Sequence, residues 1–443
     1  MFNKGISVAG TVWVTTIKSI LQITLKSQYL FSGEQFMSRI AFRKTHALIK
    51  KWAAPEVFGT GTLAKAIRQS KYADKITKSP LPCLNPYFTF FYRTKFEESP
   101  NLGHERIFVD CPDGGVIGID KMAGSTQSGN SGGKEKPIIL MCPGGNENTV
   151  ATKIQTLCKK YLDSGYDDVF VCNFRGNYNS PFKTPQFSMC HDRFNELHFA
   201  VDHINNMYRD REILLAGDCF GGMFVVDYLT TTYRPVPDNV IGGVVHSVQW
   251  NSVETRKIQF QEPQYSLFLK PMAKYQTTLL TKGKKGSETL KDMVKERIGA
   301  KNFSLISKLS FEDPSEYRQL YKLALGPLYG MWNVGSMQSY DEVEDIFNRA
   351  TSPHYKLQAN KLSRPLVVIN AYDDMTGPMG ENDIAEMERD PNMCLWLFAT
   401  GGHCGYIKHM FPQVSNFIDE VMVDCSDIVA REASSSRESV AQC

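Results

Sequence analysis

The most informative stretch of the sequence is residues 212–222, which read EILLAGDCFGG. In it a short apolar run is followed by Asp218-Cys219-Phe220 between glycines, and a helical pattern continues to Leu229. A strand that turns directly into a helix needs small residues around the turn, and it lifts one side chain above the sheet. Here that side chain belongs to Cys219, a candidate nucleophile. The N-terminus of the following helix favours negative charge, and therefore a thiolate, at this position.

Similar apolar runs lie on both sides of this stretch and alternate with helical patterns. Short apolar runs that are bounded by glycine and separated by helices indicate a parallel sheet buried on both faces. The sequence therefore predicts an α/β fold, with a mostly parallel sheet of about eight strands and helices on both faces. The expected strands are residues 106–110, 116–120, 138–142, 168–173, 212–216, 240–245, 365–370 and 395–398.

The alternation stops after His246 and resumes at Pro365. We expect a helical cap over about residues 247–360, with an apolar pocket for an acyl chain formed by residues such as Leu269, Leu325 and Leu328. The predicted organisation is an N-terminal helical segment over 1–80, the α/β domain with its cap over 81–425, and a polar, disordered tail over 426–443.

Residues 5–25 are apolar and, at roughly 20 residues, long enough to span a bilayer, although Lys18 and Gln22 interrupt them. Two interpretations stay open: a membrane anchor, spanning or lying in the plane of the surface, and a soluble helix packed on the domain. Basic residues such as Arg39 and Arg43 follow the stretch. Since positive charge tends to stay cytosolic, we expect membrane association with the catalytic domain in the cytosol, and otherwise a cytoplasmic protein.

Composition excludes several classes of function. The net charge of +3 gives no reason to expect a nucleic-acid partner. The eleven cysteines are scattered, with no CxxC pair and no metal-ligand spacing. They are therefore expected to be reduced thiols, and neither a metal nor another cofactor is expected.

A nucleophile of this kind needs a base and an orienting acid, which follow it in the order acid, then histidine. The loop after residues 365–370 contains Asp373 and Asp374. In folds with such a turn, a proline usually stands four residues beyond the acid, and Pro378 therefore favours Asp374. The loop after residues 395–398 contains His403 between glycines. The candidate catalytic residues are therefore Cys219, Asp374 and His403.

Stabilisation of a developing oxyanion needs two backbone N–H donors. Phe220, after the nucleophile, is one candidate, and Gly145 or Asn146, in the loop after residues 138–142, is the other. Arg175 is expected to tie neighbouring loops together. Asp218 would oppose a thiolate beside it, so we expect its carboxylate to turn toward solvent or a backbone donor.

These motifs resemble the abhydrolase-domain proteins one to three and their bacterial and yeast esterase relatives, in the α/β-hydrolase superfamily. The resemblance covers about residues 80–425. It implies hydrolysis of carboxylic esters, often acylglycerols or phospholipids, and often an N-terminal membrane anchor. This chain departs from the family in having Cys219 in place of serine, Asp218 before it, and Asp374-Met375 in place of an aspartate-proline pair. The motifs are Asp113-Gly114-Gly115, Pro143-Gly144-Gly145, Asn173-Phe174-Arg175-Gly176, residues 217–222, Asp373-Asp374 with Pro378, and Gly401-Gly402-His403-Cys404-Gly405.

The leading hypothesis is a carboxylic ester hydrolase that forms an acyl-enzyme on a Cys-His-Asp triad, with a lipid or small-molecule ester as substrate. An acyltransferase that uses the same thioester is the second. An inactive α/β-hydrolase scaffold that binds a lipid or a protein partner is the third.

Overall fold

The computed structural model describes residues 55–441 apart from 75–88, 91–92, 94–96, 125–135, 146, 187, 189–194, 210, 263, 284–289, 329–338 and 407–416. The apolar stretch 5–25 and the candidate donor Asn146 lie outside the described residues, as do residues 442 and 443. No helix in the described part of the chain is long and apolar enough to cross a membrane.

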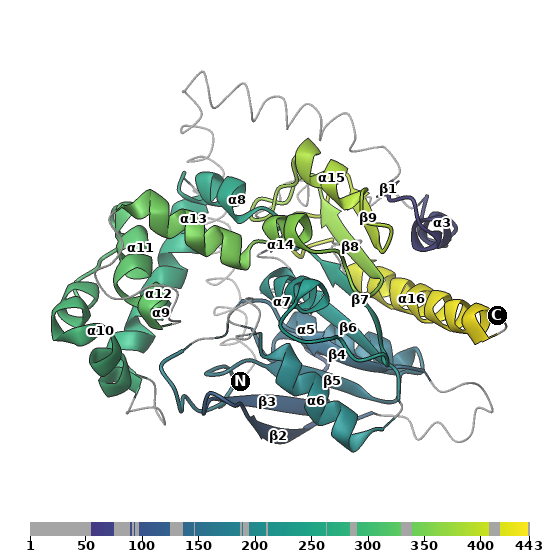
Figure 1. Ribbon diagram of the computed structural model, residues 1–443, viewed down its shortest axis with the longest axis horizontal. Coiled ribbons are helices and arrows are strands. Elements are labelled where there is room, and N and C mark those ends of the chain that lie inside the picture. The colour runs from purple at the N-terminus through teal and green to yellow at the C-terminus, as the bar shows by residue number, and fades with distance from the viewer. Residues whose placement is uncertain are drawn as a thin grey trace, which may run out of the picture.

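The core of the molecule is a nine-stranded sheet in the order β1-β9-β8-β7-β6-β4-β5-β3-β2 (Figure 1). The six neighbouring strands β5, β4, β6, β7, β8 and β9 pair in parallel, whereas β2 with β3, β3 with β5, and β1 with β9 pair antiparallel. The predicted mostly parallel sheet is therefore confirmed. The strands are β1 Glu56–Phe58, β2 His104–Asp110, β3 Val116–Met122, β4 Ile138–Cys142, β5 Val169–Asn173, β6 Ile213–Asp218, β7 Val240–His246, β8 Leu366–Ala371 and β9 Met393–Phe398.

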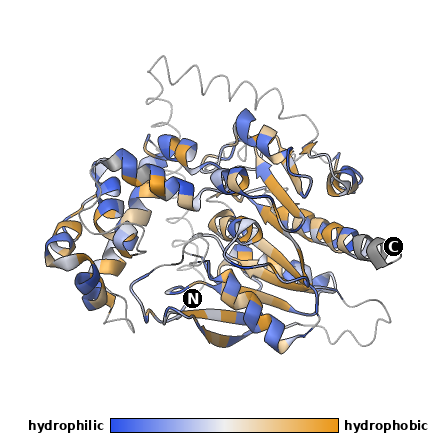
Figure 2. Cartoon of the chain, in the orientation of Figure 1, coloured by the Kyte–Doolittle hydropathy of each residue, from blue (hydrophilic) through white to orange (hydrophobic). Residues whose placement is uncertain are grey.

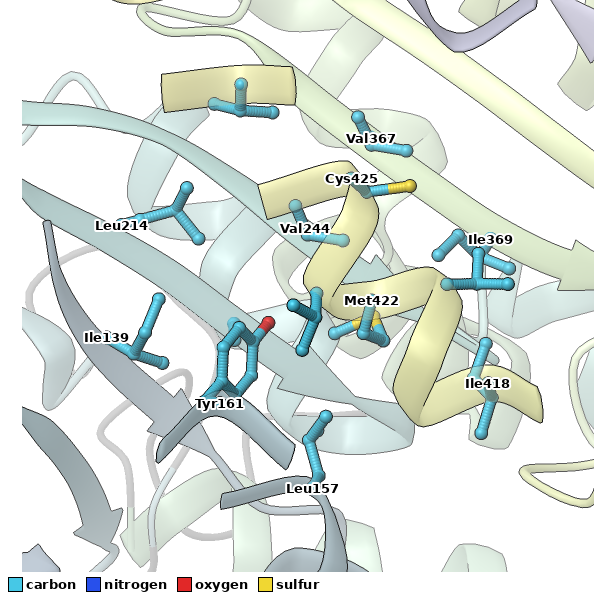
Figure 3. Close-up of a cluster of buried hydrophobic side chains, with 14 of the residues drawn as sticks. Ile139, Leu157, Tyr161, Leu214, Val244, Val367, Ile369, Ile418, Met422 and Cys425 are labelled. Atoms are coloured by element: carbon cyan, nitrogen blue, oxygen red, sulfur yellow. The ribbon is translucent and has the colours of Figure 1, made fainter. Parts of the chain in front are cut away.

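The central strands are continuous apolar runs because both of their faces are buried, as their colouring in Figure 2 shows. Successive side chains of a strand point to opposite faces. Ile139 and Leu214 accordingly belong to one hydrophobic cluster, and their neighbours Leu140 and Leu215 to the other. The first cluster is drawn in Figure 3, where Met422 and other residues of the long C-terminal helix cover the strands.

Helices cover both faces of the sheet. Those that contribute to the first cluster are α3 Thr62–Arg68, α5 Thr152–Asp163 and α16 Phe417–Ala441. Those on the opposite face are α6 Leu197–Met207, α7 Cys219–Thr230 and α15 Glu381–Met387. In α7 the side chains from residue 221 to residue 230 are all buried.

The regular elements described between β7 and β8 are all helices, and most of them lie together to one side of the sheet (Figure 1). It has a hydrophobic core of its own, which includes Leu269, Leu325 and Leu328. Phe182, from the loop after β5, joins this core, and Gln186 Nε2 donates to the Leu328 carbonyl at 3.1 Å. The elements are α8 Ser252–Gln259, the π-helix η3 Tyr265–Leu269, α9 Lys270–Lys282, α10 Leu290–Ile306, α11 Ser315–Leu320, the π-helix η4 Tyr321–Leu325, α12 Gly326–Leu328, α13 Tyr340–Thr351 and α14 Pro353–Ala359.

Two features differ from the sequence predictions. Residues 56–58 fall in the segment expected to be helical, but they form the edge strand β1 on β9. The tail from residue 426 was expected to be disordered, yet α16 continues to Ala441. The tail prediction was wrong because Ser426, Ile428 and Val429 are buried against the sheet despite the polar composition around them.

Candidate active site

The turn between β6 and α7 raises Cys219 above the carboxyl edge of the sheet. Cys219 has φ of +50°, a conformation that costs a residue with a side chain roughly 1 kcal/mol. Its side chain is partly exposed, whereas the thiols of β4, β5 and β9 are buried. The turn is tight because glycines surround it: a Cβ at Gly221 would lie 2.0 Å from the Cys142 carbonyl oxygen. These are the properties of a nucleophile elbow.

The histidine loop and the acid loop meet at this same edge. His403 Nδ1 lies 3.0 Å from Asp374 Oδ2 and 3.1 Å from Asp374 Oδ1, so the contact expected from the sequence is present. The Thr376 hydroxyl donates to Asp374 Oδ1 at 3.1 Å and also contacts His403 Nδ1. The N–H groups of Thr376 and Gly377 each donate to the same carboxylate oxygen at 2.9 Å. Asp374 is therefore held in place by three donors besides the ring.

The charge on His403 follows from these neighbours. Although burial lowers the pKa of His403, the carboxylate of Asp374 and then the thiols of Cys404 and Cys219 hold it well above its ordinary value. Among the described residues, no hydrogen bond joins the Cys219 sulfur to His403, and such contacts are often looser in an unliganded site.

Asp373 has a different role from Asp374. Its Oδ1 accepts the N–H of Gly401 at 2.9 Å and of Gly402 at 2.8 Å, which fixes the loop that carries His403. Burial raises the pKa of Asp373 to about 7, although these two donors oppose the rise.

The two candidate oxyanion donors that are described lie side by side. A Cβ at Gly145 would stand 3.7 Å from the Cβ of Phe220, so the loop after β4 passes directly over the start of α7. On the same loop, a Cβ at Gly144 would lie 3.3 Å from the Cβ of Cys219. The segments that carry the two candidate donors therefore lie next to each other and next to Cys219.

Asp218 does not turn toward solvent as expected. Its side chain is 1% exposed, and Oδ2 forms an ion pair with Lys153 Nζ at 2.5 Å. Lys153, in the first turn of α5, also pairs with Glu147 Oε2 at 2.9 Å. Although burial raises the pKa of Asp218, Lys153 and then His246 lower it below its ordinary value. A buried lysine therefore compensates the charge that the sequence places beside Cys219.

A second thiol, Cys404, follows the histidine directly and is buried. Its backbone N–H donates to Ser247 Oγ at 3.0 Å. Although burial raises the pKa of this thiol, the charges of His403 and Lys153 hold it well below its ordinary value. Any chemical labelling of this site must therefore distinguish Cys219 from Cys404.

Two buried arginines hold the surrounding loops. Arg175 binds Glu196 and donates to Asp113 Oδ2 at 2.9 Å, so its predicted role of tying loops together is confirmed. Arg93 donates to the Cys404 carbonyl at 3.0 Å and to Asp419 Oδ1 at 2.7 Å, which fastens the histidine loop to α16.

Sequence reasoning missed Arg93, Lys153 and Thr376. Lys153 did carry a signal, because a positive side chain in the first turn of a helix opposes the helix dipole and needs a specific partner. The anchoring role of Arg93 carried none, since Cys404 and Asp419 lie more than three hundred positions away along the chain and only Glu97 is a near neighbour.

A sheet in this strand order, with a sharp strand-to-helix turn at Cys219 and with an acid and a histidine after β8 and β9, defines an α/β-hydrolase. No family model matches the chain. Curated relatives place it near the abhydrolase-domain proteins. It is 24% identical to mouse phospholipase ABHD3 over 322 residues, 73% of this chain and 71% of the relative. It is 21% identical to abhydrolase domain-containing protein 2 of Drosophila melanogaster over 326 residues, 72% of this chain and 75% of the relative.

Two solved structures align with about three quarters of this chain. The esterase Pf2001 of Pyrococcus furiosus aligns over 76% of this chain and 97% of its own, with 13% identity and a TM-score of 0.43. Mouse alpha/beta hydrolase domain-containing protein 10 aligns over 73% of this chain and 96% of its own, with 14% identity and a TM-score of 0.40.

Proposed function

We propose that this chain is a carboxylic ester hydrolase that works through an acyl thioester on Cys219. The observation that carries the proposal is the His403–Asp374 pair, at 3.0 Å, on the same sheet edge as the strained Cys219. A thiolate at Cys219 would attack the ester carbonyl, and the alkoxide would leave with the proton of the His403 imidazolium. The neutral imidazole would then take a proton from water, which attacks the thioester and releases the acid.

The electrostatics support this order of events. His403 is stabilised as a cation by Asp374, so it can donate a proton to the leaving alcohol in the first half of the reaction. The N–H groups of Phe220 and Gly145 are the donors we assign to the oxyanion in both halves. Asn146, the other candidate, lies outside the described residues.

We propose lipid esters as the substrate class. Relatives of this chain are named phospholipases, and the helices between β7 and β8 form a separate apolar body that we assign as the cap over the site. The leucines expected to line an acyl pocket are themselves part of the core of that cap. If the cap binds the acyl chain, each added methylene should raise kcat/KM by roughly fourfold, from about 0.8 kcal/mol of burial. Equal kcat/KM for acetyl and octanoyl esters would refute an acyl pocket.

The decisive experiment is transfer of an acetyl group from p-nitrophenyl acetate, followed by peptide mass spectrometry. The acetyl group should appear on the peptide that contains Cys219. Cys219→Ala should abolish it and Cys219→Ser should retain part of it, because the acid, base and donors remain. Cys158→Ala, which removes a buried thiol of α5, is the matched control and should acylate like wild type.

The outcomes separate three functions. Release of free acetate supports the hydrolase. Transfer to an added alcohol or thiol in preference to water supports an acyltransferase. A wild-type protein that never acylates at Cys219, or an equally active Cys219→Ala, refutes catalysis by this thiol and leaves a binding scaffold.

We also propose that residues 5–25 attach the protein to a membrane, with the domain on the cytosolic side. The motive is the apolar stretch followed by basic residues. Deletion of residues 1–30 should move the protein from the membrane fraction to the soluble fraction. An unchanged fractionation would refute the attachment.

A further inference from the structure

Three ionisable side chains form a buried cluster beside the candidate site. Lys153 Nζ lies 2.5 Å from Asp218 Oδ2 and 2.9 Å from Glu147 Oε2. The side chain of Lys153 is 12% exposed and that of Asp218 only 1%. A lysine buried to this extent loses much of its hydration, which its contacts with the two carboxyl groups offset. Burial raises the pKa of Glu147 to about 8, although Lys153 opposes the rise, whereas Lys153 holds the pKa of Asp218 below its ordinary value.

The cluster joins the two segments that the proposed chemistry needs side by side. Asp218 precedes Cys219 at the end of β6, and Glu147 follows Gly145 on the loop after β4. A Cβ at Gly144 would lie 3.0 Å from Glu147 Oε2 and 3.2 Å from Asp218 Oδ2. The loop backbone therefore rests directly on the two carboxylates.

We propose that Lys153 is a positioning residue that clamps the oxyanion loop to the nucleophile turn through Glu147 and Asp218. This inference rests on the proposed function. The oxyanion donors must stand about 3 Å from an atom that becomes charged only in the transition state. Asn177 Nδ2 also holds the loop, by donating to the Glu147 carbonyl at 3.2 Å, but the Lys153 ammonium contacts both the loop and the nucleophile turn.

The same ion also explains how the turn accommodates Asp218. An unpaired carboxylate next to Cys219 would repel a thiolate and weaken its formation. Lys153 neutralises that charge from below, and it interacts electrostatically with Cys219 itself. Lys153 therefore has two effects: it positions the loop through Glu147, and it neutralises the charge of Asp218.

Glu147→Gln tests the positioning of the loop, because it weakens the loop's contact with Lys153 while the Lys153–Asp218 pair remains. Two reactions of Cys219 are compared: acylation by p-nitrophenyl acetate, which passes through an oxyanion, and alkylation by iodoacetamide, which does not. We expect acylation to fall about tenfold with little change in KM, since small displacements of catalytic groups are costly. Alkylation at Cys219, located by peptide mapping, should stay within about twofold of wild type, because it needs no oxyanion donor.

Lys153→Met should slow both reactions. Lys153→Arg keeps the positive charge, so it should acylate faster than Lys153→Met. Lys159→Met is the matched control: it removes an exposed ion pair with Asp163 on the same helix and should change neither rate. Acylation of Glu147→Gln at the wild-type rate would overturn the clamp and leave the proposed function intact. An equal fall of both rates in Glu147→Gln would also overturn it, because that pattern indicates general loosening. Absence of acylation in wild type overturns both proposals together.

Discussion

Substitution of Gly221 by alanine has two effects of opposite sign on the free energy of unfolding. In an exposed helix, replacing glycine by alanine stabilises by about 1 kcal/mol. At position 221, the added Cβ would stand 2.0 Å from the Cys142 carbonyl oxygen and 2.5 Å from that of Pro143, both main-chain atoms of the central strand β4 or its loop. Main chain in the middle of a buried sheet cannot retreat by the ångström or more that this contact requires.

Overpacking a rigid core costs about 3 kcal/mol, the upper part of its usual range, because the obstacle here is backbone rather than a flexible side chain. After the gain in helix propensity, the free energy of unfolding of Gly221→Ala should fall by about 2 kcal/mol. Urea-induced unfolding, followed by intrinsic fluorescence at one temperature, measures this difference. The slope with urea should not change if the unfolded state is unaffected.

Gly103→Ala is the control, because its Cβ would meet only the Cβ of Ala123, at 3.6 Å. It should change the free energy of unfolding by less than about 0.5 kcal/mol. A Gly221→Ala protein that is as stable as wild type, or more stable, would show that the contact between α7 and β4 is not as close as described, and the tight-turn argument for Cys219 would fail with it.

Three further predictions concern the histidine loop and its supports. Asp374→Asn should lower kcat/KM for esters at least about tenfold, because His403 loses the charge that holds it; a change below threefold would exclude Asp374 as the orienting acid. The pKa of Asp373 is raised from 3.8 to about 7 in the folded state, so its ionisation opposes folding as the pH rises from about 4 to 7. Relative to wild type, Asp373→Asn should therefore gain stability across that interval in urea unfolding, and a constant difference would contradict this reasoning. Arg93→Met leaves the buried Asp419 carboxylate unpaired, so the free energy of unfolding should fall by about 3 kcal/mol, and a loss under 1 kcal/mol would refute the anchoring role.

Much of the sheet could be predicted because its strands are buried on both faces. The run at 138–142 matches β4 at both ends, since every one of its residues is apolar and covered. β1 was missed because three residues are too few to show a pattern, and only the distant strand β9 makes them a strand. The end of α16 was missed because its buried residues, such as Ile428 and Val429, are few among the serines and charged residues of the sequence around them.

The candidate site also has residues that could be predicted from the sequence and others that could not. Asp374 and His403 could be found because each follows an apolar strand in a glycine-containing loop, which is a local signal. The environment of Asp218 could not be found, because Lys153 comes from a helix that precedes β6 by several elements and meets it only in the folded sheet. Reasoning from one residue's neighbours in the sequence gave the wrong orientation for that carboxylate.

Because α16 covers one face of the sheet and is the last element to be synthesised, the sheet cannot be fully buried until translation is nearly complete. β4, β6 and β7 leave the ribosome early, but the helix that packs on Ile139, Leu214 and Val244 is translated only after β9 (Figure 3). At about 5–20 residues per second, the apolar face of these strands waits roughly ten seconds or more for that helix. A nascent chain stalled before residue 417 should therefore be held by chaperones that recognise exposed apolar strands, and should mature only when α16 has been released.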